Sequence, residues 1–301
     1  MYRIYGGKGK QKNPNRQAIQ RFFLYLCTMI VLPRLDYYNM GEGVVAFSTT
    51  RHGGLSKGNY AAFNINRYCG DSEDDVRGNR MGLCEMLGIS DDRLVMPHQV
   101  HKTRVAQIDE PLLSLGIAER QEALEGADAL MTDLAGVCIG VSTADCIPVL
   151  LYDEENHAVC AIHAGWRGTV KRIVEKSVTA MAEVYGTRPH RLKAQTGPGI
   201  QVGSFEVGDE VYDAFAQEGF PMELISKKYP DNAGKWHIDL PACNRLQLLG
   251  AGLEPQHINV SPVCTFQQWA DYFSARRLGT NSGRIFTGIM VRGLMGSIRT
   301  T

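Results

Sequence analysis

A thiol and an imidazole lie on either side of a predicted β-hairpin, where together they could hold a metal ion. Apolar runs predict strands at 137–141, 147–152 and 157–162. A polar turn centred between Glu154 and Glu155 joins the last two strands, so opposed residues have numbers that add up to 309, and Cys146 faces His163. Opposed residues hold their Cβ atoms about 4.5–5.5 Å apart, so one ion about 2 Å from each donor atom would bridge them. A small buried cysteine and a hydrogen-bonded core histidine form the alternative interpretation.

A third donor is expected from a predicted strand that runs to about residue 108. His98 and His101 stand three residues apart near the start of that strand. Side chains three apart on a strand point to opposite faces, so at most one of the two can join Cys146 and His163. We favour His101, at the strand start.

Cations gather where a helix is predicted to begin after His163. Apolar residues recur at helical spacing up to Gly186, which predicts a helix with Thr169 as its N-cap and Gly186 as its C-cap. Arg167, Lys171 and Arg172 lie at this start, where the helix dipole disfavours cations. An anion bound there would balance them. Solvated surface cations are the alternative, above all for Lys171 and Arg172.

Other charged side chains flank predicted turns. Arg51 lies on a polar, glycine-rich turn after the predicted strand 44–49, and such a turn is suited to line a cleft. Arg277 and Arg284 form a further cationic cluster before the last predicted strand, 285–291. Asp145, beside the Cys146 thiol, is interpreted either as a proton carrier or hydrogen-bond partner of a ligand imidazole, or as an ordinary turn aspartate.

Composition favours a small-molecule partner. The 301 residues include 32 basic and 32 acidic side chains, so no overall charge attracts nucleic acid or an anionic membrane. Eight scattered cysteines in a chain of this length favour a reducing cytoplasm over a disulfide scaffold. No sequence feature indicates an oligomeric state.

The chain is expected to hold one domain after an N-terminal extension. The apolar run 22–32 is too short to span a bilayer, and we interpret residues 1–28 as an extension outside a domain at 29–301. Predicted helices lie at 72–87, 209–217 and 239–249. Helices, strands and hairpins alternate irregularly, which predicts an α+β fold with mixed sheets rather than a doubly wound parallel sheet.

At these residues the chain resembles the YfiH-type family, described variously as polyphenol oxidase or laccase-like and as purine nucleoside phosphorylase. The resemblance runs from about residue 47 to 291. It is carried by FSTTRHGGLS, QVH, GADALMTD, TADCIPVLLYD, AIHAGWRGT, GPGI, FEVG, DL followed by Asn244, and CT followed by YFSARR and SGR. Several such segments in one order are more specific than any one of them.

The resemblance implies a zinc ion held by His101, Cys146 and His163, in an α/β sandwich fold. It also implies phosphorolysis of adenosine, inosine, guanosine and S-methyl-5′-thioadenosine, and deamination of adenosine. Copper laccase chemistry is not expected, because the chain has eight histidines and no His-x-His pair. The His-x-Glu and Pro-Cys-x-x-Cys signature of zinc nucleobase deaminases is also absent.

Three hypotheses follow. The leading one is a zinc-dependent enzyme acting on a purine nucleoside and phosphate, with phosphate bound by Arg51, Arg167, Arg277 or the helix start at Thr169; Arg51 ranks first. The second is a hydrolase with Cys146 as nucleophile and His163 or His101 as base. The third is a zinc-stabilised binding protein with four protein ligands and no turnover.

Overall fold

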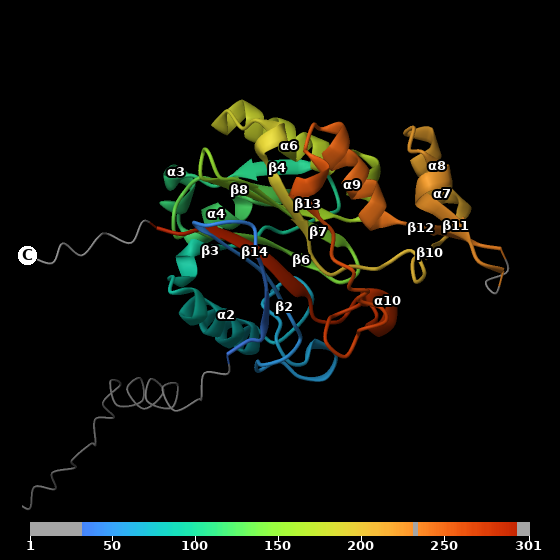
Figure 1. Cartoon of the computed structure of the whole chain (residues 1–301). Helices are drawn as coiled ribbons and strands as arrows, with labels where there is room; N and C mark the ends of the chain where they lie inside the picture. Colours follow the sequence, from blue (N-terminus) through green and yellow to red (C-terminus); the bar gives the residue numbers. More distant parts are fainter. Residues whose placement is uncertain (1–31, 231–233, 294–301) are drawn as a thin grey trace, which may run out of the picture. The chain divides into compact units, whose positions relative to one another are not determined.

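The computed structural model describes residues 32–230 and 234–293, which form two mixed sheets with one hydrophobic cluster between them and a larger one between the second sheet and its helices (Figure 1). The expectation for residues 1–28 therefore lies outside the described residues. The first sheet has, in spatial order, strands β1 (Leu35–Tyr38), β2 (Val44–Thr49), β14 (Ile285–Val291), β6 (Cys138–Thr143) and β3 (Leu94–Val95). Its strands pair antiparallel except β3, which runs parallel to β6.

The second sheet is built around the predicted hairpin. Its order is β13 (Ile258–Asn259), β9 (Lys193–Thr196), β7 (Ile147–Asp153), β8 (Ala158–Ala164), β5 (Ala127–Thr132) and β4 (Arg104–Gln107). The four central strands pair antiparallel, and each edge strand runs parallel to its neighbour. Every residue of β5, β7 and β8 is buried, as expected for strands covered on both faces.

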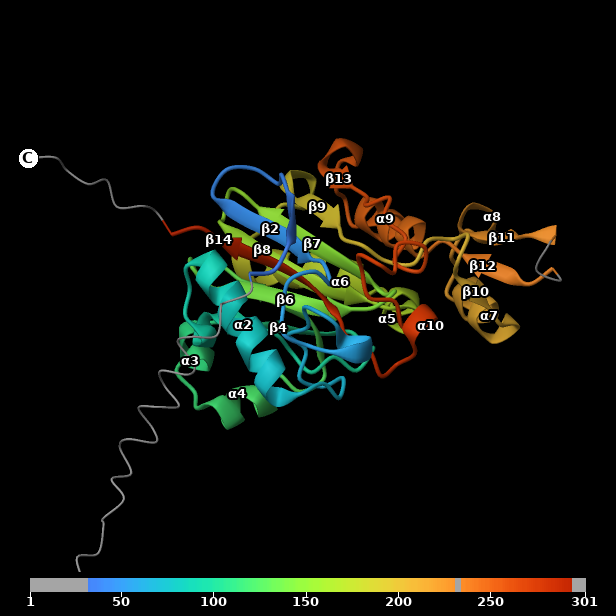
Figure 2. The ribbon, with the colours of Figure 1, turned by 90° about the horizontal axis from the view of Figure 1, so that it is seen from below.

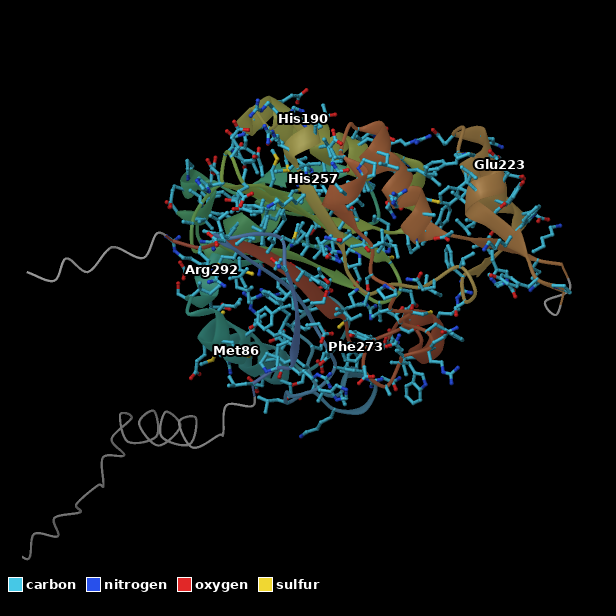
Figure 3. The ribbon with its side chains drawn as sticks, in the orientation of Figure 1. Met86, His190, Glu223, His257, Phe273 and Arg292 are labelled. Carbon is cyan, nitrogen blue, oxygen red and sulfur yellow. The ribbon has the colours of Figure 1, made fainter. Side chains whose placement is uncertain are left out.

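The two sheets pack face to face, and helices cover the outer faces (Figures 1 and 2). Successive side chains of β7 point to opposite faces of the sheet. Leu150 packs between the sheets, whereas Val149 packs towards α6 (Ile173–Tyr185) and α9 (Leu240–Gly250). On the outer face of the first sheet, Leu83 of α2 (Glu73–Leu87) shares a cluster with Phe47. In Figure 3, Met86 on α2 and His257 lie at opposite sides of this sandwich. The predicted mixed-sheet α/β sandwich is confirmed.

A small third sheet projects beside the sandwich (Figures 1 and 2). It contains β10 (Glu206–Val207), β12 (Trp236–Ile238) and β11 (Ser226–Lys228), with α7 (Asp209–Gln217) and α8 (Met222–Ile225). Tyr212 stacks on Trp236 with ring centroids 4.0 Å apart and joins α7 to this sheet. The other short helices are α3 (Glu110–Leu113), α4 (Ile117–Ala123), α5 (Trp166–Val170) and α10 (Ala275–Leu278). Among the described residues, no helix is long and apolar enough to cross a membrane.

Most predicted elements are confirmed to within a residue or two. Ser72 caps α2 and accepts a hydrogen bond from the N–H of Asp75, and Gly88 ends the helix in the left-handed conformation. Helix α7 and strands β2 and β14 have the predicted bounds, and α9 begins one residue later than predicted, after its N-cap Asp239.

The predicted register of the central hairpin is wrong by two residues. Pro148, rather than Cys146, lies opposite His163. The reason is the turn: the Asp153 carboxylate accepts the N–H groups of the second and third residues after it (3.1 and 3.2 Å), which moves the turn centre one residue along the chain. Because side chains alternate with a period of two, Cys146 stays on the face of His163 and becomes its diagonal neighbour.

The prediction that Thr169 begins a helix is also wrong. The chain forms two helices, α5 and α6, separated at Arg172, whose φ is 62°. Gly165 is the N-cap of α5, so Thr169 lies inside that helix and is fully buried. Its hydroxyl lies within hydrogen-bond distance of two acceptors, Asn244 Oδ1 (3.3 Å) and the Ala164 carbonyl (3.4 Å). The predicted C-cap, Gly186, is confirmed.

Candidate metal centre

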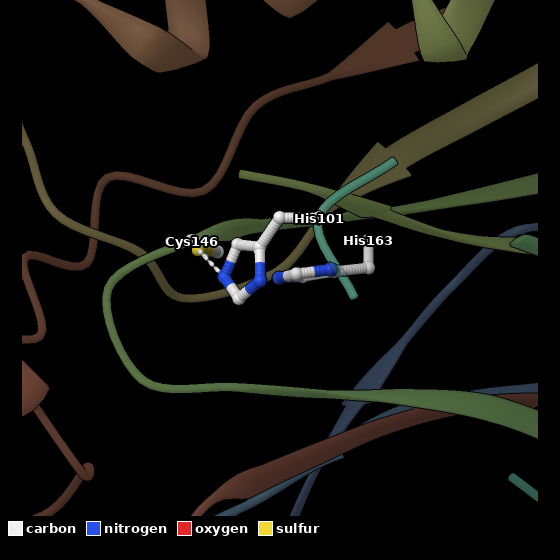
Figure 4. Close-up of side chains that lie close together, drawn as sticks. All are labelled: His101, Cys146 and His163. Atoms are coloured by element: carbon white, nitrogen blue, oxygen red, sulfur yellow. Dashed lines mark hydrogen bonds between the residues drawn. The ribbon is translucent and has the colours of Figure 1, made fainter. Parts of the chain in front are cut away.

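The three predicted metal ligands converge at one end of the second sheet (Figure 4). Cys146 lies one residue before β7, His163 is the penultimate residue of β8, and His101 lies in the loop before β4. The Cys146 Sγ is 3.9 Å from His101 Nε2, and one donor atom from each residue lies within 4.8 Å of the others. In the part of the chain that the structure describes, this is the one group of three or more such residues close enough to hold an ion.

A buried carboxylate orients this cluster. Asp128 Oδ1 lies 2.8 Å from Nδ1 of His163, so Nδ1 carries the proton and Nε2 faces the other donors. The same carboxylate accepts backbone N–H groups from Val100 (3.3 Å), His101 (2.9 Å) and Lys102 (2.7 Å). Asp128 therefore fixes one imidazole directly and the other through its loop.

Sequence reasoning assigned no role to Asp128, although a signal was available. It is the one charged residue of β5, a strand whose residues are all buried. A carboxylate inside such a strand is stable only when it is paired or hydrogen-bonded. That requirement predicts a cationic or N–H partner for Asp128 near the strand start.

The local backbone leaves room for an ion between the three donors. A Cβ atom at Gly165 would lie 2.9 Å from Cys146 Sγ, 3.0 Å from His101 Cδ2 and 3.6 Å from His163 Nε2. The φ of Gly165 is −69°, which any residue adopts, so room rather than backbone conformation favours glycine. One thiolate sulfur and two imidazole nitrogens are a donor set that suits zinc and related transition metals. The residues present therefore fit a metal ion.

Without a metal, the cluster favours a charged pair. Burial alone raises the pKa of the Cys146 thiol, but the neighbouring His163 and His101 outweigh burial and lower that pKa to about 6. Burial lowers the pKa of His163, but the Cys146 thiolate and Asp128 outweigh it and raise that pKa to about 9. The metal-free protein therefore holds a thiolate beside an imidazolium at neutral pH.

Only one of the two histidines before β4 joins the cluster, as predicted, and it is His101. His98 instead lies 2.8 Å from Glu125, and its ring stacks on Tyr68 with centroids 4.3 Å apart. The physical reason differs from the one expected, because β4 begins only at Arg104 and His101 has a φ of 60° in the preceding loop.

The cluster opens into a cavity of about 240 Å³. Besides the three donors, the wall is made of Asn66, Tyr68, Cys69, His98, Gln99, Ser142, Thr143, Ala144, Ala275, Thr280 and Arg284. None of the residues predicted to bind phosphate lies in this wall: Arg51, Arg167, Thr169 and Arg277 are all absent from it. The arginine that lies in this wall is Arg284, from the cationic cluster before β14.

Arg51 hydrogen-bonds to two other segments of the chain and does not line the cavity. Its Nε donates to the Ala61 carbonyl (2.9 Å) and its Nη1 to the Trp269 carbonyl (2.7 Å). The guanidinium carbon also lies 4.8 Å from the centre of the Phe273 ring. The sequence prediction that Arg51 lies in a cleft with free donors is therefore not supported by its surroundings.

The other two predicted cations are exposed on short helices. Arg167, on α5, packs over the ring of Trp166 at 4.3 Å. Arg277, on α10, lies between the rings of Phe266 and Trp269, at 5.2 and 5.5 Å. Both lie outside the cavity wall.

Asp145 ties together the segments around Cys146. Its Oδ1 accepts from the hydroxyl of Thr265 and its Oδ2 from the backbone N–H of Arg276, each at 2.7 Å, and its carbonyl accepts from Ile200 at 2.8 Å. The imidazole partner is thus Asp128, and Asp145 positions the loop that carries the thiol.

A mixed α/β sandwich with a thiol and two imidazoles at a polar cavity is the arrangement of an enzyme for small molecules. Residues 45–292 match the family described as multi-copper polyphenol oxidoreductase laccase. The chain is 46% identical over 245 residues to a purine nucleoside phosphorylase of Bacteroides thetaiotaomicron, covering 81% of this chain and 90% of that protein. It is 46% identical over 261 residues to adenosine deaminase RL5, from an unknown prokaryotic organism, covering 87% and 99%.

Solved structures agree with this relationship. YlmD from Geobacillus stearothermophilus superposes with a TM-score of 0.78 at 32% identity, over 87% of this chain and all of that one. YfiH from Bacillus licheniformis gives a TM-score of 0.80 at 26% identity, over 88% and 98%. The chain belongs to this YfiH-type, laccase-like family and is one of its enzymes, which confirms the resemblance read from its motifs. The described residues contain one three-donor group, which does not match a family description that names several coppers.

Proposed function

We propose that the chain is a zinc-dependent purine nucleoside phosphorylase that also deaminates adenosine. One observation carries the proposal: His101, Cys146 and His163, oriented by Asp128, converge on a polar cavity. Relatives of similar length, named purine nucleoside phosphorylase and adenosine deaminase, support the two activities. The substrates proposed are adenosine, inosine, guanosine and S-methyl-5′-thioadenosine, each with phosphate.

Three protein ligands are the pattern of catalytic rather than structural zinc. Structural sites close the tetrahedron with four protein ligands, whereas catalytic sites leave one position for water or substrate. His101 and His163 would bind the ion through Nε2 and Cys146 through Sγ. When bound, zinc would supply a Lewis acid, or a water of lowered pKa, at the cavity wall. All cysteines of the described residues are free thiols, which fits a reducing cytoplasm.

The two reactions share a nucleoside but differ in the second reactant. In phosphorolysis, a phosphate oxygen bonds to the ribose C1′ while the bond from C1′ to the purine nitrogen breaks; the purine leaves with the electron pair and takes up a proton. In deamination, water replaces the amino group of the purine and ammonia leaves. The wall residues therefore bind the nucleoside in both reactions, and phosphate in only one.

Product analysis tests the proposal. Purified protein of known zinc content is incubated with adenosine, with and without phosphate. Adenine together with ribose 1-phosphate is expected only with phosphate. Ammonia is expected in both conditions, together with inosine, which phosphate converts further to hypoxanthine. If the zinc-loaded protein forms neither adenine nor inosine, and does not cleave inosine, guanosine or S-methyl-5′-thioadenosine, the proposal is wrong.

A cysteine hydrolase is the second candidate, favoured by one observation. Asp128, His163 and Cys146 follow one another in the order of an acid, a base and a nucleophile, and the thiol has a lowered pKa. Zinc content separates the two functions, because a bound ion masks the thiolate. Turnover that survives complete zinc removal and is abolished by a thiol reagent would favour the hydrolase. A purely structural zinc site is less well supported, since the described residues supply three ligands rather than four.

A further inference from the structure

The wall of the cavity contains a cation but no carboxylate. Arg284 is its one arginine or lysine, and none of its residues is an aspartate or glutamate. The acids close by have other partners: Asp128 accepts from His163 and three backbone N–H groups, Asp145 from Thr265 and the backbone of α10, and Asp71 from Ser56 and Asn64, while Glu125 lies against His98. The Cys146 thiolate is matched by the His163 imidazolium or by a bound zinc ion, so the charge of Arg284 is not balanced within the wall, which makes the cavity complementary to an anion.

The guanidinium of Arg284 is held in a fixed orientation by its own loop. Its Nη1 donates to the carbonyls of Ser282 (2.6 Å) and Gly283 (2.9 Å), and its Nη2 donates to the carbonyl of Thr280 (2.8 Å). An arginine has five N–H groups. Within residues 32–230 and 234–293, the Nε hydrogen and one hydrogen of Nη2 have no acceptor. Nε and Nη2 are neighbours on one edge of the guanidinium, so the two free donors suit two oxygens of one oxyanion.

A second polar group without a hydrogen-bond partner lies in the same cavity wall. Thr143 is 1% exposed and belongs to the cavity wall, and its hydroxyl has no hydrogen-bond partner in the described part of the chain. On the sheet, Thr143 lies directly opposite Ile285, the residue after Arg284. A buried hydroxyl without a partner is unfavourable, so this position favours a bound polar group.

We propose that Arg284, through its free Nε and Nη2 edge, binds the phosphate that takes part in phosphorolysis, in place of the arginines that sequence spacing indicated. This inference rests on the proposed function, which supplies phosphate as a reactant. Arg51 does not fit the role because it lies outside the cavity wall, where its Nε and Nη1 donate to the Ala61 and Trp269 carbonyls. Because three carbonyls orient Arg284 before phosphate arrives, little side-chain entropy is lost on binding.

The two reactions provide an internal control for the test. Adenosine at a fixed phosphate concentration is converted by wild type and by Arg284→Gln, and the initial rates of adenine and inosine formation are measured in the same sample, before the inosine that forms is itself phosphorolysed. Loss of a charge-assisted contact to phosphate is expected to raise the KM for phosphate, and to lower the ratio of adenine to inosine, by about tenfold or more. A structural disturbance of the cavity would lower both products together and leave the ratio unchanged. An unchanged ratio therefore overturns the inference.

A matched arginine controls for the loss of backbone contacts. Arg104 also donates to two backbone carbonyls, those of Glu125 and Ala123, each at 2.7 Å, but does not line the cavity. Arg104→Gln is expected to keep the wild-type ratio of adenine to inosine and the wild-type KM for phosphate. If Arg104→Gln changes them as much as Arg284→Gln does, the effect is not due to phosphate binding at Arg284, and the inference fails.

A binding measurement separates this inference from the proposed function. Inorganic phosphate, without nucleoside, is expected to raise the melting temperature of the zinc-loaded wild type, because a ligand that binds only the folded state stabilises it. Arg284→Gln is expected to lose this increase, whereas Arg104→Gln keeps it. If wild type forms no product from any nucleoside but shows this pattern, the proposed function fails and the anion site stands. If wild type phosphorolyses nucleosides and Arg284→Gln keeps the full increase, only the inference fails.

Discussion

Asp128 Oδ1 lies 2.8 Å from Nδ1 of His163, with both side chains buried, and the same carboxylate accepts the N–H of His101. One acid thus controls both imidazoles of the cluster. Asp128→Asn replaces Oδ2 by an NH2 group, which cannot accept the N–H groups of Val100 and Lys102. We expect zinc affinity to fall about 10- to 100-fold, as for other residues that orient metal ligands. Chelator competition measures it.

A buried aspartate remote from the cluster is the control for this change. Asp153 is 1% exposed and accepts backbone N–H groups in the hairpin turn. Asp153→Asn is expected to lower the melting temperature while zinc affinity stays at the wild-type value. Equal zinc affinity in Asp128→Asn and wild type would show that His163 holds its orientation without the carboxylate.

Replacing the thiol tests the metal centre directly. Cys146→Ser is expected to lose the zinc that co-purifies with the wild type at about one ion per chain, because a hydroxyl is a poor substitute for a soft thiolate. Cys160→Ala is the control, since Cys160 is a free, fully buried thiol on β8 that belongs to the apolar core. Metal analysis by mass spectrometry gives the stoichiometry. Full zinc retention in Cys146→Ser would remove Cys146 from the ligand set.

A single methyl group tests the space between the donors. Gly165→Ala places a carbon 2.9 Å from Cys146 Sγ and 3.0 Å from His101 Cδ2, closer than ordinary contacts allow. The donors must move apart, so zinc affinity is expected to fall by about tenfold or more, as when supporting contacts of a metal site are lost. Gly203→Ala meets no atom within 4 Å and serves as the control. Zinc affinity equal to the wild type in Gly165→Ala would show that the ion lies away from this glycine.

The proximity of Cys146 to His163 could be predicted even with a hairpin register that is wrong by two residues. A register error of two residues changes a directly opposed pair into a diagonal one but leaves both side chains on the same face. An error of one residue would have moved Cys146 to the other face. The turn chemistry of Asp153, which shifts the register, depends on a side-chain hydrogen bond that hydrophobic periodicity does not report.

Other features could not be predicted because they depend on contacts between distant segments. The acceptors of Arg51 come from a neighbouring loop and from Trp269, more than two hundred residues away, so a glycine-rich turn alone made the side chain look free. The break between α5 and α6 occurs at Arg172, a residue that seldom adopts a φ of 62°. The strands of the third sheet have only two or three residues, too few to show a period.

The contacts of Arg51 change the expected effect of its removal. A phosphate ligand on a glycine-rich turn would lose activity but not stability on replacement by alanine. The contacts of Arg51 instead predict that Arg51→Ala lowers stability. Two hydrogen bonds from a half-buried guanidinium are lost, and we expect the free energy of unfolding to fall by about 1–3 kcal/mol after allowance for solvent exposure. Urea unfolding measures it. Wild-type stability together with a raised KM for phosphate would return Arg51 to the phosphate site.

The charged pair of the metal-free cluster predicts a pH window for stability. The folded-state pKa of Cys146, about 6, is below its ordinary value of 9.0. The thiolate therefore stabilises the folded state at high pH, and this stabilisation is lost as pH falls through about 6. The folded-state pKa of His163, about 9, is above its ordinary value of 6.5. The imidazolium therefore stabilises the folded state at low pH, and this stabilisation is lost as pH rises through about 9. The difference in melting temperature between metal-free wild type and metal-free Cys146→Ala is expected to be largest between these two values.

Alkylation of the thiol reads the same pKa directly and separates the two candidate functions. Thiolates react with iodoacetamide and thiols do not, so the alkylation rate of Cys146 in metal-free protein should be half-maximal near pH 6, whereas an ordinary cysteine requires a pH near 9. Peptide mapping by mass spectrometry assigns the rate to Cys146. Added zinc is expected to abolish the reaction at pH 7, because the ion occupies the sulfur lone pair. In metal-free protein, a half-maximal rate near pH 9 would show that His163 and His101 do not stabilise the thiolate. In zinc-bound protein, rapid alkylation would exclude Cys146 as a ligand and favour its role as a nucleophile.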